Sequence, residues 1–451
     1  MHKKFVHLVY KMANTNTMVY LLALLQISLS IVLIQSAPES SLVTQLPGLN
    51  ETFQSKHYAG YVTVDQNRGR NLYYYFVTSE SHPSKDPVVL WLEGGPGCSS
   101  LDSFVYAHGP FTFEKAEIRG NLPKLHLNPY SWSKVSNIIY LDSPAGTGFS
   151  YSKNESDYRT GDLKTGNDLY TFLLEWFKLY PEFLSNSLFI GGDTYAGVNV
   201  AILANQIVLG FKAGAKPKLN FKGYLIGNGA TDETLDANGI VPFAHGMGLI
   251  SDEIYEDVKS QCNGNYHGTN FTANCTTMIA KVKSSIADLN QHNILERCRH
   301  IPQEANLTSD KPMNNGNIPT WGQLSYSNVP CIDDEVATVW LNMDDVRKAI
   351  HAVDKNEVSK WEYCTTNVQY NFDAGSSLIN YHKNLTSQGY RALIYRYAQV
   401  YEKNLTFLTV KGSGYAVAQH KPKESLYFYQ RFLDGLPLTE SNADKKDESN
   451  R

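Results

Sequence analysis

The 451-residue sequence has little charge for its length, with 19% charged residues against 42% hydrophobic residues, and it contains no basic run. Without such a run, or a stripe of aromatic and basic residues, we expect no nucleic-acid partner. Three of the 40 basic residues lie in positions 1–36, which hold no acidic residue, so the remaining chain is acidic overall. Its composition is globular, and its length is enough for two domains or for one large domain with an insertion.

Long apolar runs are absent after the first 36 residues, so no later segment predicts a membrane-spanning helix. Near the N-terminus, lysines precede an apolar run from Met18 to Ile34, which ends shortly before Ser36. This pattern is typical of a secretory signal peptide, so we expect residues 1–36 to be removed and no membrane attachment to remain. The run is long for a cleaved signal, and an uncleaved signal anchor is the alternative. Either case directs the chain into the secretory pathway, to the extracellular space or the vacuole.

Cysteine is scarce, and no two cysteines are spaced as Cys-X-X-Cys, so we expect no metal site. We also expect no cofactor. An even number of cysteines in a secreted chain predicts disulfides, and six cysteines allow 15 pairings. The six are Cys98, Cys262, Cys275, Cys298, Cys331 and Cys364. Entry into the secretory route would also offer seven Asn-X-Ser/Thr sequons for glycosylation. Their asparagines are Asn50, Asn154, Asn270, Asn274, Asn306, Asn384 and Asn404.

Short runs of strand-forming residues alternate with helical stretches, a rhythm that predicts an α/β fold. The predicted strands include 88–92, 137–142, 188–192, 221–228, 391–395 and 405–410. A helix is predicted before the third of these strands, because apolar residues recur there at three-to-four-residue spacing. They are Leu169, Phe172, Leu173, Trp176 and Tyr180. A second helix is expected at about 423–434.

The rhythm changes between about residues 229 and 335, where amphipathic helical pieces, paired cysteines and a loop rich in Pro, Asn and Gly occur. We interpret this segment as a cap inserted into the α/β core. The predicted organisation is then a signal peptide (1–36), a first part of the core (37–228), the cap (229–335), a second part of the core (336–439) and a polar tail (440–451).

Two motifs follow predicted strands and carry candidate chemistry. The first, WLEGGPGCSS from Trp91 to Ser100, places glycines where backbone N–H groups can approach a substrate oxygen. The second, IGGDTYAG from Ile190 to Gly197, has the strand, turn and helix pattern of a nucleophile elbow. Either motif alone is also compatible with an ordinary tight turn.

Together with 127–152, FKGYLIGNGATD and VKGSGY, these motifs resemble the serine carboxypeptidase family and its plant serine carboxypeptidase-like members, over most of residues 55–435. The resemblance implies an α/β-hydrolase fold with a mixed central sheet and a helical cap. It also implies a Ser-Asp-His triad that removes C-terminal residues from peptides or transfers acyl groups. The disulfides that it implies join Cys98 to Cys364, Cys262 to Cys275 and Cys298 to Cys331.

The triad implied by the resemblance is degenerate in this chain. Thr194 stands at the position of the nucleophilic serine, and its β-methyl crowds a tight turn. Tyr415 stands at the position of the histidine, and a phenol, with its pKa near 10, cannot readily accept and return a proton at neutral pH. The aspartate turn expected after Tyr395 is missing, because only 20 positions separate Tyr395 from Tyr415. We therefore expect part of the C-terminal sheet region, a helix and a strand, to be lost.

The resemblance also assigns binding positions. Gly95 and Tyr195 correspond to the backbone positions of the oxyanion hole. The positions that hold a substrate carboxylate are occupied by Glu93, Gly94, Ala107 and Asp193. An ionised Glu93, in place of the family's asparagine, would repel that carboxylate.

The sequence thus predicts a secreted serine carboxypeptidase-like protein that is catalytically impaired and binds a peptide or an acylated small molecule. One alternative is an active serine-type carboxypeptidase or acyltransferase with substitute catalytic residues. The other is a non-functional product of a decaying gene, which would account for Thr194, Tyr415 and the missing turn together.

Overall fold

The structure is a computed structural model that describes residues 37–114, 122–268, 270–287, 289–290, 293–295, 335–396 and 404–438. The predicted signal peptide (1–36), the predicted tail (440–451), Cys298, Cys331 and Asn306 lie outside these residues. Five of the other sequon asparagines are exposed, and Asn154 is partly buried. None of the helices in the described part of the chain has both the length and the apolar content needed to cross a membrane.

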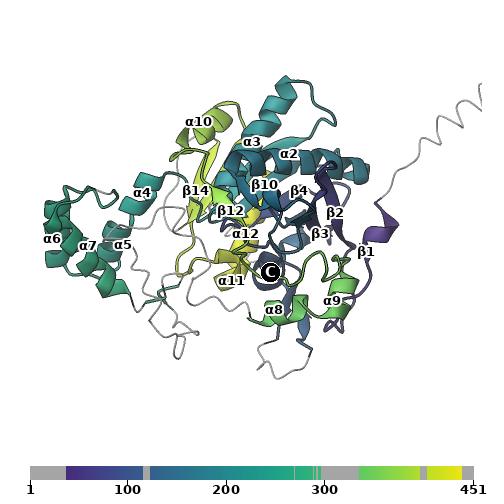
Figure 1. Cartoon of the computed structure of the whole chain (residues 1–451), viewed down its shortest axis with the longest axis horizontal. Coiled ribbons are helices and arrows are strands. Elements are labelled where there is room, and N and C mark those ends of the chain that lie inside the picture. Colours follow the sequence, from purple (N-terminus) through teal and green to yellow (C-terminus); the bar gives the residue numbers. More distant parts are fainter. Residues whose placement is uncertain are drawn as a thin grey trace, which may run out of the picture.

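A mixed sheet of ten strands forms the centre of the molecule, as expected for the predicted fold class (Figure 1). Its strands, in spatial order, are β1 (Leu42–Val43), β2 (His57–Asp65), β3 (Arg70–Val77), β7 (Asn137–Leu141), β4 (Val88–Leu92), β10 (Leu188–Asp193), β11 (Phe221–Gly227), β13 (Arg391–Arg396) and β14 (Leu405–Thr409), with β8 (Tyr151–Ser152) paired to β3. The pairings from β1 to β7 are antiparallel, and those from β7 to β14 are parallel. Every residue of β4 and β7 is buried, which explains the continuous apolar sequence of β4 and of β7 after Asn137.

Helices cover both faces of this sheet. Successive residues of β3 point to opposite faces, so Tyr74 and Phe76 join one apolar cluster while Tyr73 and Tyr75 join the other. The first cluster includes α2 (Asp162–Leu179), α3 (Ala196–Lys212) and α10 (Ile379–Ser387), and all five residues of the predicted apolar stripe belong to it. The second includes α8 (Glu335–Leu341), α9 (Asp344–Ala349), α11 (Val417–His420) and α12 (Pro422–Asp434).

Short elements connect these layers. They are the two-stranded pairs β5 (Phe111–Phe113) with β6 (Leu125–Leu127) and β9 (Arg159–Gly161) with β12 (Gln369–Asn371), and the short helical turns η1 (Glu39–Ser41), η2 (Ser103–Ala107), η3 (Trp132–Lys134), η4 (Glu155–Tyr158) and η5 (Pro181–Phe183).

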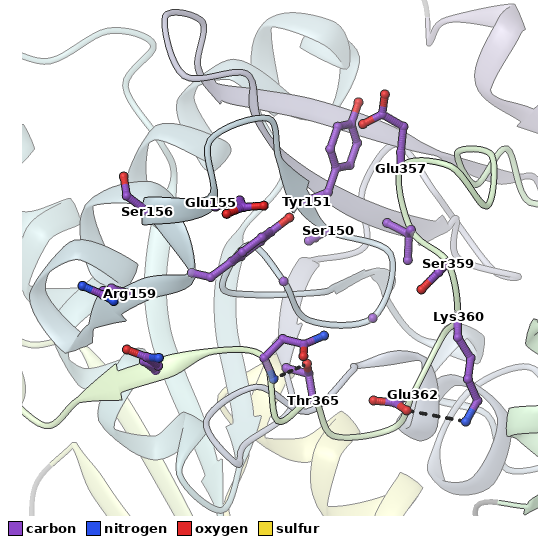
Figure 2. Close-up of a pocket in the computed structure, with 16 residues that line it drawn as sticks. Ser150, Tyr151, Glu155, Ser156, Arg159, Glu357, Ser359, Lys360, Glu362 and Thr365 are labelled. Atoms are coloured by element: carbon purple, nitrogen blue, oxygen red, sulfur yellow. Dashed lines mark hydrogen bonds and ion pairs between the residues drawn. The ribbon is translucent and has the colours of Figure 1, made fainter.

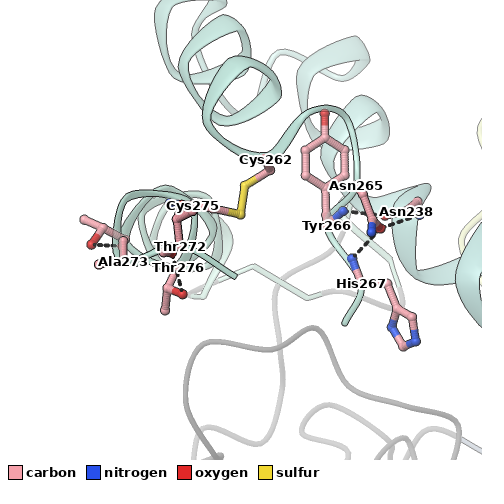
Figure 3. Close-up of a disulfide and its surroundings, with 10 residues drawn as sticks. Asn238, Cys262, Asn265, Tyr266, His267, Thr272, Ala273, Cys275 and Thr276 are labelled. Atoms are coloured by element: carbon pink, nitrogen blue, oxygen red, sulfur yellow. Dashed lines mark hydrogen bonds between the residues drawn. A yellow bond between two sulfur atoms is a disulfide. The ribbon is translucent and has the colours of Figure 1, made fainter. Parts of the chain in front are cut away.

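The segment interpreted as a cap contains a cluster of helices with its own small core. The helices are α4 (Glu233–Asn238), α5 (Ile240–Gly246), α6 (Asp252–Cys262) and α7 (Ala273–Ile286), at the left of Figure 1. Val241, Val258 and Ile279 are buried among them. The predicted disulfide between Cys262 and Cys275 is present and joins the end of α6 to the start of α7 (Figure 3).

The predicted strand at 405–410 is present as β14, which pairs in parallel with β13, from Ala392 opposite Leu405 to Arg396 opposite Thr409. The helix and strand that we expect to be lost would lie between these two strands, where residues 397–403 are outside the described part of the chain, so their loss stays a prediction. The shortening lies in the connection between β13 and β14. Eight residues, 397–404, separate them, whereas a parallel crossover usually needs a dozen or more. A connection shorter than usual therefore joins two neighbouring parallel strands.

Aromatic side chains fix the C-terminal helix α12 to the core, and Tyr429 makes the closest ring contact among them. The ring of Tyr429 stacks on Trp132 with 3.8 Å between ring centroids, and its hydroxyl lies 2.7 Å from the hydroxyl of Ser136. Tyr429 is fully buried, whereas Tyr427 on the same helix is 41% exposed. The shortened C-terminal part of the chain is therefore held by packing as well as by strand pairing.

We expect Tyr429→Ala to lower the free energy of unfolding by about 3 to 5 kcal/mol, because it empties a buried aromatic site. Tyr427→Ala, the matched control on the exposed face, should cost less than about 1 kcal/mol. Urea denaturation of both variants measures the difference. Equal small losses would show that α12 does not pack on the core as described.

Candidate active site

The turn between β10 and α3 has the backbone geometry that the sequence predicts for a nucleophile elbow. Thr194 sits at its tip with φ of 58°, a left-handed conformation that is strained for a β-branched residue. Neighbouring backbone groups hold it there: the Thr194 N–H donates to the carbonyl of Gly227 at 3.0 Å, and its own carbonyl accepts from the N–H of Ala230 at 3.0 Å. The strain is thus balanced by contacts with the segment that follows β11.

The glycine-rich loop after β4 lies directly against this turn. A Cβ added at Gly94 would come within 2.4 Å of the Tyr195 nitrogen and 2.5 Å of the Asp193 carbonyl oxygen, so only glycine fits. The contact holds together the two segments that carry Gly95 and Tyr195, whose backbone N–H groups the resemblance assigns to the oxyanion hole. The structure therefore brings the two predicted motifs into one place.

Hydrogen bonds to buried groups hold the glycine-rich loop on both sides. On one side, the backbone N–H of Glu93 donates to the Ser100 hydroxyl at 3.0 Å. On the other, buried Asp142 accepts hydrogen bonds from the Ser99 hydroxyl at 2.6 Å and from the Ser100 N–H at 3.1 Å. Burial raises the pKa of the Asp142 carboxyl to about 7, since these hydrogen bonds only partly offset its removal from water.

The predicted disulfide between Cys98 and Cys364 is also present and joins the glycine-rich loop to the segment that contains Cys364. Backbone hydrogen bonds flank it, from Ser99 N–H to the carbonyl of Tyr363 at 2.7 Å and from Thr365 N–H to the carbonyl of Gly97 at 3.0 Å. The loop is therefore tied to a segment that lies 266 residues away in the sequence.

Two carboxyl groups from the predicted substrate positions meet at this site. Glu93 is buried and accepts a hydrogen bond from the Ser103 hydroxyl at 2.6 Å, and burial raises its pKa to about 7. Asp193 accepts from the Thr194 N–H at 3.0 Å, and burial together with the charge of Glu93 raises its pKa well above its ordinary value. Near pH 5 Glu93 is therefore neutral and able to donate a hydrogen bond, and the pKa of Asp193 is shifted in the same direction.

Two further residues adjoin this acid pair, and sequence reasoning did not assign either of them a role there. The charge of Asp102 adds to the rise in the pKa of Asp193. Tyr395 is buried, and its pKa is raised well above the ordinary value by burial and by the charges of Asp193 and Glu93. Asp102 lies two residues after the end of the glycine-rich motif at Ser100, and no sequence pattern pointed to a role for it.

Asn228 is the residue that connects the turn at Thr194 with the turn that carries Tyr415. Its side-chain amide donates to the Tyr415 carbonyl at 2.7 Å and to an Asp193 carboxylate oxygen at 3.4 Å. Asn228 has φ of 44°, so it too holds a left-handed conformation just after β11. The backbone of Tyr415 is therefore brought next to the elbow, as the resemblance implied. The sequence feature that could have identified Asn228 as a site residue is its position, because an asparagine directly after a buried strand is unusual.

The remaining predicted positions play supporting parts in the geometry. Ala107 ends η2, the short helix that also supplies Ser103 to Glu93, and it packs against the core. The Tyr195 hydroxyl donates to Asp162 at the start of α2, at 2.6 Å, which fixes the first turn of α3.

Three histidines are buried in the core, each hydrogen-bonded to a tyrosine. They are His57 with Tyr75 at 3.0 Å, His108 with Tyr140 at 3.1 Å, and His382 with Tyr224 at 2.8 Å. Burial lowers the pKa of each imidazole, to about 3 for His57 and His108 and to about 4 for His382. All three imidazoles are committed to core packing.

The strand order, the strained turn at Thr194 and the glycine-rich loop against it define an α/β-hydrolase. A family model described as "Serine carboxypeptidase" matches residues 47–398. The chain therefore belongs to the serine carboxypeptidase family.

Curated relatives of high similarity carry the same description. The chain is 49% identical over 481 residues to "Serine carboxypeptidase-like 20" of Arabidopsis thaliana, covering 91% of this chain and 96% of that protein. It is 48% identical over 473 residues to "Serine carboxypeptidase 1" of Hordeum vulgare, covering 89% and 94%. Both alignments are longer than this chain, so each relative has internal segments without a counterpart here.

Among solved structures, the chain resembles the crystal structure of KEX1(delta)P, a prohormone-processing carboxypeptidase from Saccharomyces cerevisiae. The TM-score is 0.68 at 19% sequence identity, and the match covers 90% of this chain and 98% of that one. At this identity the likeness shows the fold alone.

We expect Gly94→Ala to lower the free energy of unfolding by about 3 kcal/mol or more, because its methyl group would overlap the backbone of the turn. Gly246→Ala in α5 is the matched control, since an added Cβ there meets no atom within 4 Å. The control should change stability by no more than about 1 kcal/mol. Chemical denaturation of the two variants checks this, and equal stabilities would contradict the close contact.

The raised pKa of Glu93 predicts a stability that falls with pH. The folded state holds this proton more tightly than the unfolded chain, where the ordinary pKa is 4.5, so the contribution is complete below pH 4.5 and lost as the pH rises through about 7. Between pH 4.5 and 8, the native protein should lose about 3 kcal/mol more than Glu93→Gln. Asp142 titrates in both proteins and cancels in the comparison. Identical urea-unfolding profiles against pH would contradict the shift, and exposed Glu253→Gln is the control.

Proposed function

We propose that this chain is a secreted, catalytically impaired serine carboxypeptidase-like protein that binds a peptide or an acylated small molecule at the candidate site. It would act in the extracellular space or the vacuole. The supporting observation is that the backbone geometry of a nucleophile elbow is intact, whereas Thr194 occupies its tip and Tyr415 lies on the adjoining turn. The geometry favours binding, and the side chains do not favour turnover.

The chemistry of these two side chains argues against efficient acyl transfer. A threonine hydroxyl needs an adjacent base to become a nucleophile, and a phenol that titrates near pH 10 is a poor acceptor of its proton at neutral pH. The eight-residue connection after β13 leaves little room for the aspartate turn that the family triad uses. The longer alignments with the relatives agree with a loss of internal sequence.

Binding, in contrast, retains its main features. The segments that carry Gly95 and Tyr195 are in contact through Gly94, and Glu93 is neutral below about pH 7. A neutral carboxyl group donates a hydrogen bond to a ligand carboxylate, whereas an ionised one repels it. The expected repulsion by Glu93 is therefore confined to pH values above about 7.

A direct test is to produce the full chain in a eukaryotic host and to incubate it with a panel of blocked dipeptides. We expect no release of C-terminal residues by the native protein, by Thr194→Ser, by Tyr415→His or by the double variant, because neither substitution restores the aspartate. An oxyanion hole without a triad would supply at most an acceleration on the order of a thousandfold over water.

The other outcomes identify the alternatives. Release of C-terminal residues that is abolished by Thr194→Ala would show an active enzyme with substitute residues and would contradict the proposal. Failure to obtain any cooperatively unfolding protein would favour the decaying gene product.

Ligand binding has its own pH test. A blocked dipeptide with a free carboxylate should raise the melting temperature at pH 5 and have a much smaller effect at pH 8, where Glu93 is ionised. At 100 times its dissociation constant, such a ligand adds about 2.7 kcal/mol of stability. The same peptide with a C-terminal amide is the control and should show little dependence on pH. Equal shifts for both peptides at both pH values would exclude Glu93 as a carboxylate-binding group.

A further inference from the structure

A cavity of about 640 Å³ lies between residues 146–159 and residues 357–369 (Figure 2). This volume is typical of a site for a small molecule. Its described lining includes neither the turn at Thr194 nor the glycines of the loop after β4. The cavity is therefore separate from the candidate active site, although Thr365 in its wall hydrogen-bonds to the back of that loop.

The lining is almost entirely polar. Of the 16 lining residues, six carry hydroxyl groups, two carry side-chain amides, three carry carboxylates and two are cationic, which leaves Val358 as the one aliphatic side chain. A pocket for an apolar metabolite would need mostly hydrophobic walls. The chemistry of the walls instead suits a ligand with many hydrogen-bonding groups.

The charged side chains of the cavity lining disfavour most ionic ligands. Three carboxylates outnumber the two cations, and the ammonium of Lys360 is already 3.5 Å from a Glu362 carboxylate oxygen, so a phosphate or another anion is disfavoured. No cluster of three metal-ligating side chains occurs among the described residues. Arg159 on the rim opposes a strongly cationic ligand. A neutral ligand rich in hydroxyl groups fits these walls best.

Two tyrosine rings give the cavity flat, partly exposed faces. The Tyr158 hydroxyl donates to the Ser152 carbonyl at 3.1 Å, which fixes the Tyr158 ring in the cavity lining. The Tyr151 ring packs edge-on against Tyr61, and its hydroxyl points towards Glu357. Amphipathic rings beside carboxylates and hydroxyls can contact the C–H face of a sugar while its hydroxyl groups are hydrogen-bonded.

A sequon borders the cavity. Asn154 directly precedes Glu155 and Ser156, which both line it. The Asn154 side-chain carbonyl accepts hydrogen bonds from the Ser156 N–H at 3.1 Å and from its hydroxyl at 2.8 Å. The Asn154 amide nitrogen, the atom that carries an N-linked glycan, takes part in neither of these hydrogen bonds. It lies on the opposite side of the amide group from the carbonyl oxygen that accepts them. A glycan at Asn154 would therefore start at the edge of the cavity.

We propose that this cavity is a saccharide-binding site. Its ligand is either the first sugars of a glycan on Asn154 or a free saccharide, and both sources share the chemistry described above. The proposal does not depend on the proposed function, because it concerns a different set of residues.

The test uses the full chain from a eukaryotic host, with mass spectrometry of glycopeptides to measure the occupancy of Asn154. N,N′-diacetylchitobiose and maltose are titrated against the native protein and against Asn154→Gln, and binding is followed by saturation-transfer NMR. In the Asn154→Gln background, we expect Glu155→Gln with Glu357→Gln to weaken binding at least about tenfold, since hydrogen bonds to charged groups are lost. Glu253→Gln, on the exposed face of α6, is the matched control and should leave binding unchanged.

The native protein distinguishes the two sources. Binding of added sugar that is weak in the glycosylated protein and strong in Asn154→Gln identifies the chain's own glycan as the occupant, whereas equal binding identifies a free saccharide. If Asn154→Gln does not fold, native protein trimmed to a single N-acetylglucosamine by an endoglycosidase replaces it. The proposal is overturned if no protein binds either sugar up to about 10 mM. It is equally overturned if the double glutamine variant binds as tightly as its parent.

Discussion

The contact between Gly94 and the backbone of the turn after β10 is the constraint on which the candidate site depends. Strands β4, β10 and β11 run parallel and end at the same edge of the sheet, so the segments that follow them must share one small space. Glycine at 94 lets the first loop approach the turn, and the Gly227 carbonyl and the Ala230 N–H hold Thr194 in its strained conformation. Backbone contacts thus set the geometry of the candidate site. This geometry does not require a catalytic side chain at position 194.

Electrostatics at this site are set by burial. Glu93 and Asp193 lie near each other without a basic partner among their described contacts, so their carboxyl groups keep protons that exposed acids would lose. Asp142, on the other side of the loop, behaves in the same way. The loop therefore lies between Glu93 and Asp142, two acidic groups whose pKa values of about 7 leave them neutral in mildly acidic surroundings.

Much of the fold was predictable because its signals are local. The buried strands, the stripe on α2 and the strand-turn-helix at Thr194 are visible in spacing and residue type, and two disulfides followed from the family resemblance. The strand β14 was also predicted, at 405–410, because its run of strand-forming residues is a local signal. Asn228 was missed because its two partners come from segments far apart in the chain.

The short connection between β13 and β14 has a consequence for how such a protein can change over time. The sheet keeps its strand order, and with it the positions of the strand ends, although the chain between two of its strands is reduced to eight residues. The strands fix the places where the loops of the candidate site begin, so a connection elsewhere in the sheet can differ in length without moving those places. Such connections can therefore vary in sequence and length while the framework stays the same.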